Sequence, residues 1–125
     1  MAKILIVDDS GMSRRSLRRI LETAGHEVIE AQDGIAALEL YFIEKPQIVL
    51  LDLTMSGMYG VDVLTKMRAM DPNACVIVAS ADIQSSTRAL VEDAGARGFI
   101  TKPFGVDQVL NVVKLALKEA TDGIE

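Results

Sequence analysis

Hydrophobic residues are grouped along this chain in five short runs, separated by longer stretches in which they recur every three or four positions. The short runs lie near residues 3–8, 27–31, 47–52, 75–80 and 98–102 and are rich in Val, Ile and Leu, as buried strands are. The stretches between and after them have the spacing of amphipathic helices. The pattern therefore predicts five β-strands, each followed by a helix.

The same spacing predicts which side of each helix faces the core. Asp33 is a good N-cap for the second helix, Gly25 and Gly95 follow the first and fourth, and Asp71-Pro72 ends the third. The expected core positions, helix by helix, are Met12, Leu17, Ile20, Leu21 and Ala24; Ala36, Ala37, Leu40 and Tyr41; Val61, Leu64, Met67 and Met70; Ile83, Thr87, Leu90, Val91 and Ala94; and Val106, Val109, Leu110, Val113 and Leu117.

Strict alternation of strands and helices is typical of an α/β fold in which a parallel sheet is covered by helices on both faces. A chain of 125 residues is long enough for one such domain. We expect the domain to span residues 1–120 and the tail 121–125 to be frayed. In open sheets of this kind, ligands bind outside the carboxyl ends of the strands, where the winding reverses.

Composition limits the kinds of molecule that this protein is expected to bind. The net charge of −5 argues against nucleic acid as a main partner, and Cys75 is the single cysteine, so neither a disulfide framework nor a cysteine metal site is expected. No apolar stretch approaches the roughly 20 residues of a membrane span, and no signal peptide is recognisable. We therefore expect a cytoplasmic protein that binds neither nucleic acid nor membranes directly.

Charged and hydroxyl side chains follow the strands where the runs end. Asp8 and Asp9 follow the first run, Asp52 ends the third, Ser80 ends the fourth and Lys102 ends the fifth. Three carboxylates at one edge of a sheet repel each other unless a cation lies among them, and oxygen ligands of this kind suit Mg²⁺. Each residue alone could be a turn or helix cap, but their coincidence at one edge favours a site.

These groups are also the parts that phosphoryl transfer needs. A metal and a lysine neutralise phosphoryl oxygens, and a carboxylate nucleophile forms an acyl phosphate. Asp52 is the best candidate nucleophile, because it stands at the strand end and is followed by a loop containing Thr54.

Four segments that contain these residues match a known pattern. The sequence resembles, over essentially its whole length, the receiver domain of two-component response regulators, above all stand-alone receivers such as the chemotaxis type. The resemblance implies a flavodoxin-like (βα)5 fold with strand order 2-1-3-4-5. The segments are Val7-Asp8-Asp9-Ser10, Asp52-Leu53-Thr54-Met55 with Gly60 after it, Ala79-Ser80-Ala81, and Thr101-Lys102-Pro103-Phe104.

The resemblance implies a role for each matching position. Asp52 would accept phosphate from a histidine kinase or phosphotransfer protein. Asp9, Asp52 and the backbone carbonyl of Thr54 would bind Mg²⁺, or Mn²⁺ in its place, and Asp8 would join directly or through water. Lys102 would bind a phosphoryl oxygen. The Lys102–Pro103 peptide bond would be cis, which would fix the direction of the lysine. The chain would act as a signalling switch that catalyses only its own phosphorylation and dephosphorylation.

The switch itself would involve two further positions. Ser80 would bind the phosphoryl group and move inward, and the ring of Phe99 would follow it. Phe99 lacks the hydroxyl of the Tyr that is frequent there, while Ser56 and Tyr59 also depart from the common pattern. We hypothesise that Thr54 and Asp82, two residues beyond Asp52 and Ser80, set the lifetime of the acyl phosphate.

Two surfaces are candidates for partner binding. Arg14, Arg15, Arg18 and Arg19 on the first helix form either a solvated face or a dock for an acidic kinase or phosphotransfer surface. By helical angle, Leu115 lies opposite the core side of the fifth helix, and Val112 lies to one side. With the fourth helix and fifth strand they suggest a surface for a downstream target or a dimer. We expect a monomer, and the sequence leaves open a dimer after phosphorylation.

Four other functions can be compared with the residues. A phosphatase with an aspartate nucleophile needs a second acid two residues later, where this chain has Thr54. A flavodoxin-like cofactor module needs a phosphate-binding loop after the first strand, where Asp8 and Asp9 would repel phosphate. A receiver-like scaffold that is never phosphorylated would not need the complete set of Asp8, Asp9, Asp52, Ser80 and Lys102. A DNA-binding regulator would require a second domain.

Overall fold

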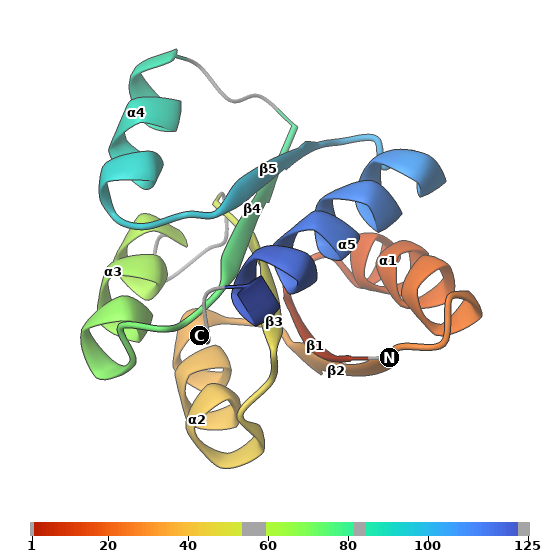
Figure 1. Ribbon diagram of the computed structural model, residues 1–125, viewed down its shortest axis with the longest axis horizontal. Coiled ribbons are helices and arrows are strands. Elements are labelled where there is room, and N and C mark those ends of the chain that lie inside the picture. The colour runs from red at the N-terminus through yellow and green to blue at the C-terminus, as the bar shows by residue number, and fades with distance from the viewer. Residues whose placement is uncertain (1, 54–59, 82–84, 123–125) are drawn as a thin grey trace.

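The computed structural model describes residues 2–53, 60–81 and 85–122, and in these ranges five strands alternate with five helices (Figure 1). Each strand boundary lies within one residue of the hydrophobic run that predicted it. The strands are β1 (Lys3–Val7), β2 (Glu27–Ala31), β3 (Ile48–Asp52), β4 (Val76–Ser80) and β5 (Gly98–Thr101). The helices are α1 (Gly11–Thr23), α2 (Gly34–Glu44), α3 (Gly60–Met70), α4 (Ser85–Asp93) and α5 (Val106–Asp122).

The strands form one parallel sheet in the order β2-β1-β3-β4-β5, which confirms the predicted fold. The chain passes from β1 outward to β2 and then crosses back to β3 on the other side of β1. The winding therefore reverses between β1 and β3, and the carboxyl ends of these two strands flank the position where such sheets bind ligands.

Two hydrophobic clusters, one on each face of the sheet, form the core. Successive strand residues point to opposite faces, so that Leu5 and Val7 belong to one cluster and Ile4 and Ile6 to the other. Helices α1 and α5 cover one face, and α2, α3 and α4 cover the other (Figure 1). The strands are buried on both faces, which explains why they read as continuous hydrophobic runs.

Local signals at the helix ends work as the sequence predicts. The Asp33 side chain accepts a hydrogen bond from the Ala36 amide at 2.8 Å and caps α2. Gly25 and Gly95, which follow α1 and α4, have φ angles of 93° and 104°, a region that favours glycine. Helix α3 ends at Met70, directly before Asp71-Pro72.

The predicted core faces of the helices were too wide at five positions. Met12, Met70, Leu90 and Val106 are 75%, 49%, 54% and 54% exposed. Ala24, the C-cap of α1, is exposed as well. Met12, Met70 and Val106 lie in the first or last turn of their helices, and Leu90 precedes Val91, which takes the buried position in α4. A helix touches a sheet along a narrow stripe, so periodicity alone overestimates the buried width. Ile83 lies outside the described residues.

The C-terminal helix is longer than expected. Helix α5 extends to Asp122, which is inside the tail 121–125 where fraying is predicted, while residues 123–125 lie outside the described part. The domain limits of 1–120 therefore stay a prediction. Among the described helices, none combines the length and the apolar content that crossing a bilayer requires.

Candidate functional site

The carboxyl edge of the sheet brings together residues that are far apart in the sequence. Asp8 directly follows β1, Asp52 is the last residue of β3, Ser80 is the last residue of β4 and Lys102 directly follows β5. The amide of Lys102 donates a hydrogen bond to the carbonyl of Ser80 at 2.9 Å, which extends the pairing of β4 and β5 to this edge. The predicted placement of these side chains at one edge is confirmed.

Three of the side chains form an acidic cluster. Asp8, Asp9 and Asp52 each offer one carboxylate oxygen, and these oxygens all lie within 4.8 Å of one another. Asp8 and Asp52 are buried, whereas Asp9 is exposed. Buried carboxylates at this separation repel one another, and the set consists only of oxygen atoms, which are the ligands of hard divalent cations.

Lys102 partly balances the cluster. Its Nζ lies 3.0 Å from Oδ2 of Asp8 and 3.6 Å from Oδ1 of Asp52. The Lys102 side chain is 21% exposed, while those of Asp8 and Asp52 are 2% and 3% exposed, so these attractions are only weakly screened by water. The Lys102 ammonium group contacts two of the three carboxylates, and one positive charge does not balance all three.

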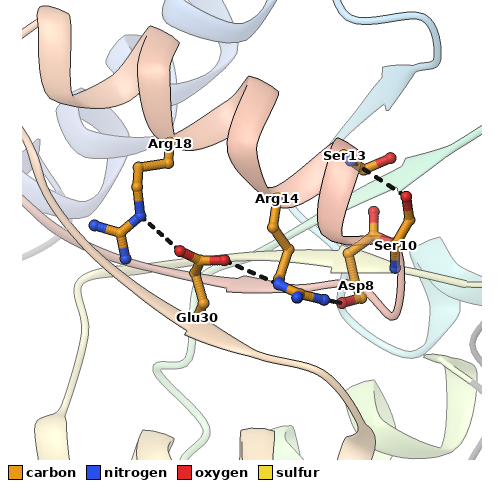
Figure 2. A network of polar contacts seen from close by, with 6 residues as sticks. All are labelled: Asp8, Ser10, Ser13, Arg14, Arg18 and Glu30. Atoms are coloured by element: carbon orange, nitrogen blue, oxygen red, sulfur yellow. Dashed lines mark hydrogen bonds and ion pairs between the residues drawn. The ribbon is translucent and has the colours of Figure 1, made fainter.

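Asp8 is held from several directions. Its amide donates to the Ala31 carbonyl at 3.1 Å, and its Oδ1 accepts from the Ser10 amide at 2.9 Å. Its carbonyl accepts a hydrogen bond from Nη1 of Arg14 at 2.7 Å (Figure 2). With the Lys102 contact at Oδ2, both the main chain and the side chain of Asp8 are fixed.

Gly60 allows helix α3 to approach the end of β3. A Cβ atom at this position would lie 2.6 Å from the carbonyl oxygen of Asp52 and 2.6 Å from Cα of Leu53, both of which are backbone atoms. The Gly60 amide donates to the Leu53 carbonyl at 3.3 Å. A side chain would therefore push α3 away from the strand end that carries Asp52.

The residues expected to form the switch lie on the β4–β5 side of the sheet. Ser80 is buried, and Phe99 is partly buried and packs against the hydrophobic cluster beneath α3 and α4. The guanidinium carbon of Arg88 on α4 lies 4.5 Å from the centre of the Phe99 ring. The Lys102–Pro103 bond is cis, as the resemblance implied.

Thr54, Ser56, Tyr59 and Asp82 lie outside the described residues. Their predicted roles therefore stay predictions.

The four arginines of α1 do not form one uniform surface. Arg14 and Arg18 both donate to Glu30 on β2, at 2.9 Å and 2.6 Å (Figure 2). Arg18 also contacts Glu22 at 2.9 Å. Burial raises the pKa of Glu30, but the hydrogen bonds from Arg18 and Arg14 outweigh it and hold that pKa below its ordinary value. Arg15 and Arg19 are exposed.

The sequence analysis did not identify Glu30, nor the hydrogen bonds of Arg14 to Glu30 and to the Asp8 carbonyl. It treated the arginines as like-charged neighbours four residues apart, because the repulsion between them can be read from helical spacing. Glu30 lies on another element, and no spacing rule links a strand position to a helix face. Glu27 and Glu30 are three residues apart on this strand and therefore point to opposite faces of the sheet, so the run itself gives no signal that Glu30 meets the first helix.

The apolar surface of α5 is smaller than predicted. Leu115 is 58% exposed, as expected, but Val112 packs against the core cluster beneath α1 and α5. On α4, Leu90 is also exposed.

Two other reactive side chains have structural explanations. Cys75 is buried, and burial raises the pKa of its thiol, as expected for an inert cysteine. Nδ1 of His26 accepts a hydrogen bond from the Ala2 amide at 3.1 Å.

Comparison with known proteins identifies the family. The model of the response regulator receiver domain matches residues 4–114. The chain is 42% identical over 122 residues to the chemotaxis protein CheY of Listeria monocytogenes, an alignment that covers 94% of this chain and 100% of that protein. It is 40% identical over 117 residues to CheY of Thermotoga maritima, covering 93% and 98% of the two chains.

Solved structures agree with this assignment. The fold superposes on the crystal structure of a CheY-like response regulator receiver domain protein from Methanospirillum hungatei with a TM-score of 0.93, at 28% identity and with 98% of both chains covered. The shared strand order, the acidic residues at the switch point and the sequence matches over nearly the whole chain lead to one conclusion: this protein belongs to the family of response regulator receiver domains.

Proposed function

We propose that this chain is a single-domain response regulator of a two-component phosphorelay, in which Asp52 accepts a phosphoryl group from a histidine kinase or a phosphotransfer protein. The observation that supports this most directly is the grouping of Asp8, Asp9 and Asp52 within 4.8 Å, with Lys102 against two of them. Two relatives that match over nearly their whole length are chemotaxis proteins named CheY, which supports a protein that signals through contacts with other proteins.

The proposed reaction takes place on the side chain of Asp52. A carboxylate oxygen attacks the phosphorus of the donor, a P–O bond to Asp52 forms, and the P–N bond of a phosphohistidine breaks with its electron pair leaving on the imidazole. The product is an acyl phosphate. In the return step water attacks the phosphorus, the P–O bond to Asp52 breaks, and inorganic phosphate and the carboxylate are released.

The acidic cluster fits a divalent cation, and we propose Mg²⁺, with Mn²⁺ as a substitute. Ligands of one Mg²⁺ at 2.0–2.1 Å lie at most about 4.2 Å apart, so oxygens within 4.8 Å need only a small adjustment or one bridging water. Both carboxylate oxygens of Asp8 already accept hydrogen bonds, which favours the water-mediated position for Asp8. Asp9, Asp52 and the Thr54 carbonyl are the proposed direct ligands. When bound, the cation neutralises charge on the transferred phosphoryl group.

Lys102 and Ser80 complete the proposed site. The Lys102 ammonium, which contacts Asp8 and Asp52, is placed to bind an oxygen of the incoming phosphoryl group. Ser80 would bind another oxygen after phosphorylation, and movement of its loop would let Phe99 turn inward. The phosphoryl group would thus favour one of two conformations.

Hydrolysis of the acyl phosphate is proposed to depend on Thr54 and Asp82, which follow Asp52 and Ser80 by two residues. Decay of phosphorylated Thr54→Ala and Asp82→Ala proteins should differ from decay of the parent. Equal rates in all three proteins would contradict this part of the proposal.

The phosphodonor is proposed to dock on α1. Exposed Arg15 and Arg19 suit an acidic donor surface, and an apolar cavity of about 320 Å³ lies beside Arg19, lined also by Ile20 and Thr23 of α1 and by Val106 and Leu110 of α5.

For the downstream target we propose the surface of α4, β5 and α5, where Leu90 and Leu115 are exposed. A Leu115→Glu protein that kept both target binding and oligomeric state would contradict this assignment.

The direct test is the intact mass of the protein after incubation with acetyl phosphate and Mg²⁺. One phosphoryl group should be added to the parent, and none to Asp52→Asn or to the parent with a chelator. Addition to Asp52→Asn would show that another residue is the acceptor. Multiple turnover of phosphate esters would favour a phosphatase, and failure of the parent to react at all would favour an unphosphorylated scaffold.

A further inference from the structure

The guanidinium group of Arg14 joins two parts of the molecule. Its Nε donates to Oε1 of Glu30 on β2 at 2.9 Å, and its Nη1 donates to the carbonyl oxygen of Asp8 at 2.7 Å (Figure 2). The other carboxylate oxygen of Glu30 accepts from Nε of Arg18 at 2.6 Å. Glu30, which pairs with both Arg14 and Arg18, therefore holds the Arg14 guanidinium group in a defined orientation.

The contact with Asp8 constrains the position of Asp9. The carbonyl of Asp8 and the amide of Asp9 belong to one peptide unit, which is planar. Asp8 is buried and Asp9 is exposed, so the peptide between them is the point where the chain leaves the core. Holding its carbonyl fixes the N and Cα atoms of Asp9, from which the Asp9 side chain starts.

The positive charge of Arg14 and its role in positioning would have opposite effects on cation binding. A cation next to a cluster of carboxylates lowers the affinity of that cluster for another cation, if only electrostatic attraction matters. The side chain of Arg14 is only 15% exposed and that of Glu30 27% exposed, so water screens the pair only in part. Glu30 neutralises the guanidinium group while leaving its Nη1 donor directed at Asp8.

We propose that Arg14 is a positioning residue for the cation site: held by Glu30, it fixes the peptide between Asp8 and Asp9 and thereby directs the Asp9 carboxylate toward the cation. This inference rests on the proposed function, in which the acidic cluster binds Mg²⁺. Groups that orient metal ligands in this way commonly change metal affinity by about 10–100-fold when they are removed.

The first test is the affinity for Mg²⁺, followed through backbone amide shifts in a magnesium titration. Arg14→Met should weaken binding by about tenfold or more, whereas loss of a positive charge alone would strengthen it. Arg15→Met, which removes the same charge from an exposed neighbour, should stay within about twofold of the parent because exposed charges are screened. Tyr41→Phe, which loses a 2.7 Å hydrogen bond to Asp71 away from the acids, should destabilise the fold without changing the affinity.

The second test needs no metal. In the metal-free protein, the backbone amide order parameter of Asp9 should fall in Arg14→Met and stay unchanged in Arg15→Met. Glu30→Gln should lower it in the parent background but have little further effect when Arg14 is already Met, because the two residues act as one unit.

The outcomes separate this inference from the proposed function. If the parent binds no Mg²⁺, the metal site is wrong, and the order parameter of Asp9 still decides whether Arg14 positions that residue. If Arg14→Met binds Mg²⁺ as tightly as Arg15→Met does, or if Asp9 stays equally ordered in both, Arg14 is not a positioning residue.

Discussion

The ammonium group of Lys102 lies 3.0 Å from Oδ2 of Asp8, although 94 residues separate them in the chain. In the sheet, β3 and β4 lie between the strands that carry these two residues. The Lys102 side chain therefore reaches across the ends of the central strands and passes close to Asp52, whose Oδ1 is 3.6 Å from Nζ. The candidate site is complete only when all of these strands are in place.

Removal of Lys102 should destabilise the protein in the absence of metal. Lys102→Ala leaves two buried carboxylates without their cation, and we expect a loss of about 1–3 kcal/mol in the free energy of unfolding. Urea unfolding in a chelating buffer measures this. Lys114→Ala on the exposed side of α5 is the control and should change stability by less than about 0.5 kcal/mol.

Magnesium should stabilise the parent and not the Asp9→Asn protein. A ligand that binds only the folded state adds about 2.7 kcal/mol at a concentration 100 times its Kd. Without metal, Asp9→Asn should melt above the parent, because one of three repelling carboxylates is neutral. Thermal unfolding with and without Mg²⁺ tests both statements. Asp107→Asn, which alters an exposed acid on α5, should keep the response to Mg²⁺.

A methyl group at position 60 should disturb the end of β3. Gly60→Ala places Cβ against backbone atoms of Asp52 and Leu53, and we expect a cost of about 1–3 kcal/mol in urea unfolding. At Gly11, in contrast, a Cβ would meet only the ends of two arginine side chains at 3.4 and 3.5 Å. Gly11→Ala should therefore be tolerated, and equal losses at the two positions would contradict the packing argument.

Glu30 should contribute to stability above its ordinary pKa and not at low pH. Its folded-state pKa is lowered, so its contribution is present above the unfolded value of about 4.5 and disappears as pH falls through the folded-state value. The stability difference between the parent and Glu30→Gln should therefore shrink below that pH. Glu27→Gln, an exposed position on the same strand, should show a smaller difference throughout the range.

Reversal of the exposed arginine charges should affect only the protein phosphodonor. The Arg15→Glu/Arg19→Glu protein should take phosphate more slowly from a histidine kinase that phosphorylates the parent, and at the same rate from acetyl phosphate. Lys66→Glu/Lys114→Glu changes the net charge equally at exposed positions on α3 and α5. If this second variant slows the kinase reaction as much, or if both donors are slowed equally, docking on α1 is wrong.

The sequence by itself determined the alternation of strands and helices, the helix caps at Asp33 and Gly25, and the delivery of Asp8, Asp52, Ser80 and Lys102 to one edge of the sheet. These follow from local periodicity and from the common direction of parallel strands. The tertiary structure alone decided the contacts between elements, such as Glu30 between Arg14 and Arg18, or Val112 packed against the core while Leu90 is exposed. The physical reason is that periodicity records which side of one element avoids water. Which side chains meet across two elements depends on register and packing, which short-range patterns do not contain.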